Sequence, residues 1–204
     1  MRSLIGMALQ QWDSDSSWNA IHELRNRGTP ETVARCQRLF QSRNWRKRTL
    51  AINVMCQLRI TLVKGQSADY AVDTAHTMLL EGLRDPHPEV VAAAAFGCGH
   101  RRGLDAIEPL IRLSTHVCAS VRFGVAFGLC FRENERALDA LVQLAGDSDD
   151  DVRNWATFGL AEAALDTPSI RERLWRNTQD PFDEVRNEAL AGLTKRGDPR
   201  VTDP

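Results

Sequence analysis

The stretch at residues 147–159, DSDDDVRNWATFG, contains the pattern that decides the fold. An acidic turn leads into Val152-Arg153, and Ala156 and Leu160 follow at helical spacing. Copies of the pattern recur at a nearly constant interval on both sides, where the Val-Arg positions hold Val90-Val91, Val121-Arg122 and Val185-Arg186. A repeat of roughly 30 residues is typical of stacked helix pairs. The sequence therefore predicts an all-α solenoid.

Weaker copies around Arg48 and Ala20 extend the repeat to most of the chain. We expect a right-handed α-α superhelix of about six helix pairs, forming one repeat domain over residues 1–197 with a polar tail at 198–204. The predicted repeats lie near 1–28, 29–60, 61–101, 102–132, 133–165 and 166–197. The interval between equivalent positions is longest between Arg48 and Val91, where residues 64–67 predict a flexible or partner-specific loop.

Composition and charge limit the class of protein. Only one Tyr, seven Phe and five Trp are present, so Ala, Leu and Val must supply most of the core. Residues 1–64 hold 11 Lys/Arg against 4 Asp/Glu, whereas residues 65–204 hold 15 against 23, so the charge is dipolar. The five cysteines form no CxxC pair, and the N-terminus lacks an apolar run long enough for a signal or a membrane span. We expect a cytoplasmic protein with reduced thiols that does not associate with membranes.

The turn-and-helix pattern D-x-x-x-x-V-R-x-x-A resembles that of HEAT repeats, in particular the bacterial HEAT-like repeats of the phycobilisome-lyase type. It stands at residues 147–156 and 180–189, and in weaker form at 85–94 and 115–125. The resemblance implies a helical superhelix that binds another macromolecule along its inner face. Similar bacterial proteins include immunity proteins, subunits that assist cofactor attachment, and enzymes that excise alkylated DNA bases.

Aromatic side chains recur on one side of the second helix in three of the repeats. Val152, Ala156 and Leu160 share one side of their helix, so Asn154 and Trp155 lie on the other. If the second helices line the inner face, as in the HEAT family, these rings form a strip that binds a partner protein. Alternatively, each ring fills the seam between neighbouring helices. The candidate partner-binding residues are Phe96, Phe123, Phe127, Asn154, Trp155, Phe158 and Asn187.

Arginines recur in the first turn of the second helices, where a cation opposes the helix dipole. A carboxylate from the turn of the same or the next repeat would compensate each guanidinium and join the repeats. We expect a structural ladder made by Arg122, Arg153, Arg186, Asp147 and Asp180, with ligand binding as the alternative.

A basic patch surrounds one tryptophan in the first third of the chain: Arg43, Trp45, Arg46, Lys47 and Arg48. Such a group can hold phosphates with a base stacked on the ring, or bind an acidic protein surface. A solvated basic face with Trp45 packed inward is the other interpretation. The sequence pI of about 6.5 argues against a dedicated nucleic-acid-binding protein.

Catalytic motifs are missing from the sequence: there is no HExxH, GxSxG or phosphate-loop spacing, and the five histidines are dispersed. Helix capping explains the run Asp149 to Asp151 without a metal. We therefore predict no catalytic residue, no metal and no cofactor.

The primary hypothesis is a non-enzymatic scaffold that grips a partner protein on its concave face. Its most concrete form is an immunity protein that inhibits a toxin. The alternative is a nucleic-acid-binding or alkylated-base-excising protein that uses the basic first third; a DNA glycosylase or a cofactor-attachment lyase subunit is the enzymatic version.

Overall fold

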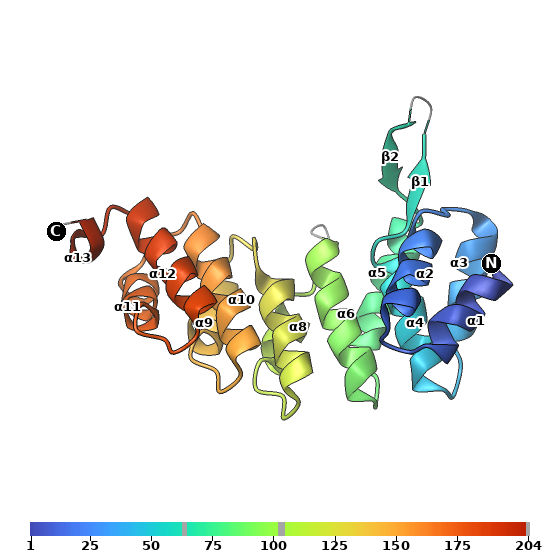
Figure 1. Cartoon of the computed structure of the whole chain (residues 1–204), viewed down its shortest axis with the longest axis horizontal. Helices are drawn as coiled ribbons and strands as arrows, with labels where there is room; N and C mark the ends of the chain where they lie inside the picture. The colour runs from blue at the N-terminus through green and yellow to red at the C-terminus, as the bar shows by residue number, and fades with distance from the viewer. Residues whose placement is uncertain (63–64, 102–104, 203–204) are drawn as a thin grey trace. The chain divides into compact units, whose positions relative to one another are not determined.

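The computed structural model describes residues 1–62, 65–101 and 105–202 (Figure 1). Consecutive helices pair along these residues, which confirms the predicted solenoid of helix pairs. The pairs are α1 (Arg2–Gln10) with α2 (Asp15–Arg25), α3 (Pro30–Phe40) with α4 (Trp45–Met55), α5 (Val72–Gly82) with α6 (Pro88–His100), α7 (Ile107–Leu113) with α8 (Ala119–Leu129), α9 (Glu135–Leu144) with α10 (Asp150–Glu162), and α11 (Pro168–Asn177) with α12 (Asp183–Lys195).

The chain divides into two compact units, residues 1–104 and 105–204. Each unit contains three of the helix pairs. In the first unit the second helices α2, α4 and α6 pack in that order, and in the second unit α8, α10 and α12 do the same (Figure 1). The second helices of each unit therefore present a common surface.

The repeated apolar positions form the core, as the pattern predicts. Val152, Ala156 and Leu160 of α10 are fully buried, and so are their equivalents Val121, Val125 and Leu129 in α8 and Val185, Ala189 and Leu193 in α12. Polar residues begin the helices: the Thr29 hydroxyl accepts from the N–H of Thr32, and Asp149 accepts from the N–H of Val152. The spacing of core residues and caps explains why the chain folds as repeated short helices.

A glycine allows α12 to approach α10 closely. A Cβ atom on Gly192 would lie 2.8 Å from the Cβ of Ala161 and 2.9 Å from its Cα, and Ala161 belongs to α10. Any larger side chain would push the two helices apart. The glycine of the repeated pattern therefore sets the spacing of the second helices.

The inserted segment contains a β-hairpin, which the sequence did not predict, and Ser67 at the end of the predicted loop belongs to its second strand. β1 (Arg59–Thr61) pairs antiparallel with β2 (Ser67–Asp69), with Ile60 opposite Ala68. The buried guanidinium of Arg101 fixes the base of the hairpin, because its Nη2 donates to the carbonyl of Leu58 and its Nη1 pairs with Asp69 at 2.6 Å. Lys64 of the predicted loop lies outside the described residues.

Residues 198–202 pack on the last repeat, although the sequence indicated a polar tail. A short helix, α13 (Pro199–Thr202), contacts α12. The carboxylate of Asp198 is buried and accepts hydrogen bonds from Arg171 at 3.3 Å and from Nε of Arg200 at 2.9 Å. These two guanidinium groups compensate its charge.

Replacing Gly192 by alanine is expected to destabilise the second unit by about 1–3 kcal/mol, because the added methyl overlaps α10. Gly6→Ala is the matched control, since nothing lies within 4 Å of the added Cβ there and alanine favours a helix. Chemical denaturation of the two variants measures the difference. Equal stabilities would contradict the close approach of α10 and α12.

Candidate structural ladder and partner-binding face

Two arginines of the second unit bind the aspartate in the turn of the next repeat. Nε and Nη2 of Arg122 donate to the two carboxylate oxygens of Asp147, both at 2.7 Å. Arg153 binds Asp180 in the same way, at 2.7 and 3.0 Å. Both arginine side chains are 14% exposed, so water competes weakly with these bidentate pairs. Each pair joins two consecutive repeats.

The same guanidinium groups also hold the turn of their own repeat. Nη1 of Arg122 donates to the carbonyl of His116 at 2.8 Å, and Nη1 of Arg153 donates to the carbonyl of Asp147 at 3.1 Å. These carbonyls and the aspartate compensate a cation placed at a helix start, where the dipole disfavours it. One side chain therefore closes its own turn and fixes the next one.

Arg48, which the sequence also placed in the basic patch, takes part in the same arrangement. Its Nε and Nη2 donate to Asp85 at 2.7 and 2.8 Å, and its Nη1 donates to the carbonyl of Ser42 at 2.9 Å. A guanidinium with these partners is not available to a phosphate. The repeat spacing placed Arg48 and Val91 at one position and could have revealed this role.

Arg186 occupies the ladder position of the last repeat and bonds within that repeat. Its Nη1 donates to the carbonyls of Asp180 at 2.7 Å and Pro181 at 2.9 Å, and its Nη2 contacts the exposed Asp183. Its side chain is 35% exposed, against 14% for Arg153. Among the predicted ladder residues, Arg186 thus closes its own turn without reaching a following one.

The aspartates of these pairs have lowered pKa values. Burial alone would raise the pKa of Asp180, but hydrogen bonds from Arg153 and from the N–H of Phe182 outweigh burial and hold the pKa below its usual value. Burial is likewise outweighed at Asp85 and Asp147, where Arg48 and Arg122 lower the pKa. All three groups are therefore ionised at neutral pH.

The ladder residues are replaced where the chain divides into its two units. Val91 stands at the arginine position of α6, and His116 stands at the aspartate position of the following turn. Nδ1 of His116 accepts from the N–H of Cys118 at 3.0 Å, as Asp147 accepts from the N–H of Asp149. The histidine keeps the turn but does not provide a carboxylate.

A second set of arginines, which sequence reasoning missed, caps the other end of the second helices. Arg196 at the end of α12 donates to the carbonyls of Leu160 and Ala163 of the preceding repeat, at 2.7 and 2.8 Å. Arg101 at the end of α6 donates to the carbonyl of Met55 at 3.0 Å. Arginine recurs at this position of the repeat, as Arg101, Arg132 and Arg196. That recurrence in the sequence could have revealed the capping role.

The aromatic residues of the second unit form a cluster across α8 and α10. The ring of Trp155 lies edge-to-face with those of Phe127 at 4.9 Å, Phe158 at 5.6 Å and Phe123 at 6.3 Å. Phe131 adds a further edge contact with Phe158 at 5.7 Å. The four rings at 123, 127, 155 and 158 are each half-buried. They pack on one another across the seam and retain exposed area.

The other candidate partner-binding residues are placed separately. Phe96 belongs to α6 of the first unit, where its ring lies edge-to-face with His100 at 5.1 Å. Asn154 and Asn187 are at equivalent positions of α10 and α12, the first half-buried and the second exposed. A binding role for all seven residues stays a prediction.

The remaining basic patch keeps cations at the surface but not an open aromatic ring. Arg43 and Arg46 are exposed and Lys47 is half-buried. The ring of Trp45 is stacked on His87 with centroids 4.3 Å apart, and the guanidinium of Arg46 lies over it at 5.3 Å. The ring on which a base would stack thus already has two groups against it.

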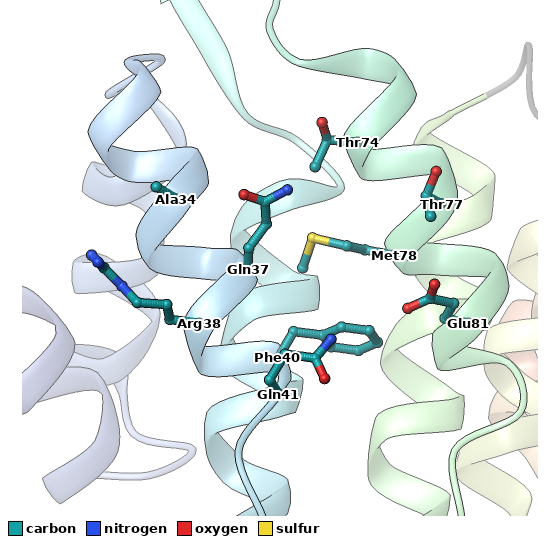
Figure 2. A pocket seen from close by; sticks show the side chains of 9 residues that line it. All are labelled: Ala34, Gln37, Arg38, Phe40, Gln41, Thr74, Thr77, Met78 and Glu81. Carbon is teal, nitrogen blue, oxygen red and sulfur yellow. The ribbon is translucent and has the colours of Figure 1, made fainter.

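A groove of about 660 Å³ lies between α3 and α5 in the first unit (Figure 2). Phe40 and Met78 point toward each other from the two helices, and both are almost fully buried. Amides and hydroxyls line the walls: Gln37, Gln41, Thr74 and Thr77. Arg38 and Glu81 lie on opposite sides, so these lining residues do not form an acid-base pair (Figure 2).

The acidic run at 149–151 brings three carboxylates within 4.8 Å of one another. Asp149 caps α10, and Asp150 and Asp151 are exposed in its first turn, where the helix dipole stabilises anions.

No helix in the described ranges is both long and apolar enough to cross a bilayer.

Comparison with known proteins supports the repeat assignment. Residues 77–161 match the family model of HEAT repeats. Residues 77–161 therefore have the sequence pattern of HEAT repeats. Protein YibA of Escherichia coli strain K12 is 37% identical over 82 residues, which are 40% of this chain and only 29% of the length of YibA.

Solved structures show the same fold. An X-ray structure of Escherichia coli YibA aligns with a TM-score of 0.77 and 25% identity, covering 98% of this chain and 72% of the other. A designed armadillo repeat protein in complex with the peptide (KR)4 aligns with a TM-score of 0.57 and 17% identity, covering 94% of this chain and 98% of the other. Helical repeat scaffolds of this type commonly bind peptides or proteins.

Acidification is expected to weaken the ladder. Because the pKa of Asp180 is lower in the folded state, its contribution is present above the unfolded pKa near 4 and is lost as the pH falls through the folded pKa. Asp180→Asn should lower the free energy of unfolding at pH 7 by about 1–3 kcal/mol. Between pH 7 and acid pH, the free energy of unfolding of this variant should fall less than that of the unsubstituted chain. Denaturant titrations at about pH 7, 4 and 3 test both effects.

The matched control for Asp180→Asn is Asp139→Asn, which removes the same charge from an exposed position of α9. Its acid response should equal that of the unsubstituted chain. An equal acid response for Asp180→Asn as well would show that the Arg153–Asp180 pair does not contribute.

Proposed function

We propose that this chain is a non-enzymatic scaffold that binds a partner protein with the aromatic surface of its second unit. The observation that supports the proposal is the half-exposed cluster of Phe127, Trp155 and Phe158. Aromatic side chains gathered at the centre of a patch are the usual energetic hot spots of protein interfaces. The ladder holds α8, α10 and α12 in register, so the patch is organised before a partner arrives.

We propose more specifically that the partner is a toxin, which the chain inhibits in the cytoplasm. An immunity protein needs a rigid surface that binds one protein tightly, and preorganised rings on packed helices lower the entropy cost of such binding. The support for this version is the resemblance to bacterial HEAT-like repeat proteins, in addition to the cluster itself.

The geometry favours a protein partner over nucleic acid. Arg48 is bound by Asp85, and His87 and Arg46 already lie against the ring of Trp45. These contacts remove one phosphate-binding cation and the stacking ring that the nucleic-acid alternative requires.

Site-specific photo-crosslinking tests the proposal. A photoreactive residue at Phe158 should give a covalent adduct with one protein in the cells that naturally make this chain. The same residue at Asp139, exposed on α9, should not. A variant that carries the photoreactive residue at position 158 together with Trp155→Ala should give no adduct. Circular dichroism should show that the helices of this variant remain intact. Adducts of equal yield from both positions, or none from Phe158, would contradict the proposal.

The adducted protein then tests the finer version. Expressed alone it should arrest growth, and expression of this chain should restore growth. A partner that is harmless when expressed alone would refute a role in immunity and leave the scaffold proposal intact.

A further inference from the structure

The exposed sides of α10 and α12 carry mainly hydrogen-bond acceptors. Residues at helical spacing form one stripe on α10: Asp151, Asn154, Trp155, Phe158 and Glu162. The equivalent stripe of α12 occupies the same slots one repeat later: Glu184, Asn187, Glu188, Ala191 and Lys195. These two stripes, which we call the acceptor face, hold four carboxylates and one cation. The cation, Lys195, lies 3.3 Å from Glu162.

One buried acceptor of this face lacks a donor among the described residues, and a half-buried carboxylate lies on the neighbouring stripe. The buried Oδ1 of Asn154 has no hydrogen-bond partner. The carboxylate of Glu188 is half-buried, and burial together with repulsion from Glu162 raises its pKa. A buried acceptor without a donor costs free energy. A donor supplied by a partner would remove that cost at Asn154, and a cation would offset the repulsion between Glu188 and Glu162.

An aromatic ring lies beside these acceptors. Trp155 and Glu188 occupy equivalent positions of two packed helices, whose axes are about 8–10 Å apart in such contacts. The rings of Phe127 and Phe158 stand almost perpendicular to the Trp155 ring and restrict its orientation, and Trp155 keeps exposed area. A cation is attracted to the face of an indole, and a carboxylate on the opposite side adds a charge-assisted hydrogen bond.

We propose that the acceptor face binds a basic, extended segment of the partner protein, with an arginine side chain placed between Trp155 and Glu188. This inference rests on the proposed function and names the chemistry of the partner. Arginine fits better than lysine because its planar guanidinium stacks on the indole while its N–H groups donate to the carboxylate and to Asn154. The excess of carboxylates on the face attracts a cationic segment and repels an acidic one.

Titration of the whole protein with the peptide (KR)4, followed by isothermal calorimetry, tests the proposal. The peptide should bind, and Glu188→Gln should weaken binding about tenfold, as expected for the loss of one charge-assisted hydrogen bond. Trp155→Leu should weaken it to a similar extent. Asp139→Asn removes the same charge from α9 and should change the affinity less than about twofold. An acidic peptide of equal length should not bind.

The outcomes separate this inference from the function on which it rests. Equal weakening by Glu188→Gln and Asp139→Asn would mean that only overall charge attracts the peptide, and the proposal would fail. No binding of (KR)4 would also overturn it. If crosslinking from Phe158 still captures a protein in that case, the scaffold function stands and its partner contacts the face with a different chemistry.

Discussion

A guanidinium shared between two turns is the interaction on which the arrangement of the second helices depends. Arg122 and Arg153 each bond to carbonyls of their own turn and to an aspartate of the next repeat. An arginine at a helix start is unfavourable by itself, so the pairing is needed for the residue to be tolerated there. At the other end of the helices, Arg196 caps the preceding α10. Both ends of α10 are thus tied to neighbouring repeats.

That rigid spacing explains why rings can be left partly exposed. Gly192 lets α12 approach α10, and the ladder keeps α8, α10 and α12 in one register. The aromatic side chains then contact each other by their edges instead of filling the core, which Val, Ala and Leu already fill. Where Val91 and His116 replace the pair, the chain divides into its two units.

Sequence periodicity could predict the repeated elements because the same slots recur at a nearly constant interval along the chain. It located the core stripe and the arginines that bind aspartate.

Periodicity did not predict the hairpin of β1 and β2, because an insertion occurs once and its short strands lack an alternating apolar pattern. The role of Arg48 was missed for a different reason: adjacent cations suggested a patch, although its partner Asp85 lies 37 residues away. Whether a ring is exposed depends on side-chain packing, which spacing does not determine.

A double-mutant cycle between Arg122 and Asp147 tests most directly whether the shared guanidinium joins one repeat to the next. The free energies of unfolding of Arg122→Ala, Asp147→Ala and the double variant, compared with the unsubstituted chain, give the coupling energy of the pair. Asp147 also accepts from its own turn, and the cycle subtracts that contribution. A coupling energy of about 2 kcal/mol is expected for a bidentate pair largely shielded from water. A value below about 0.5 kcal/mol, typical of an exposed ion pair, would contradict the account.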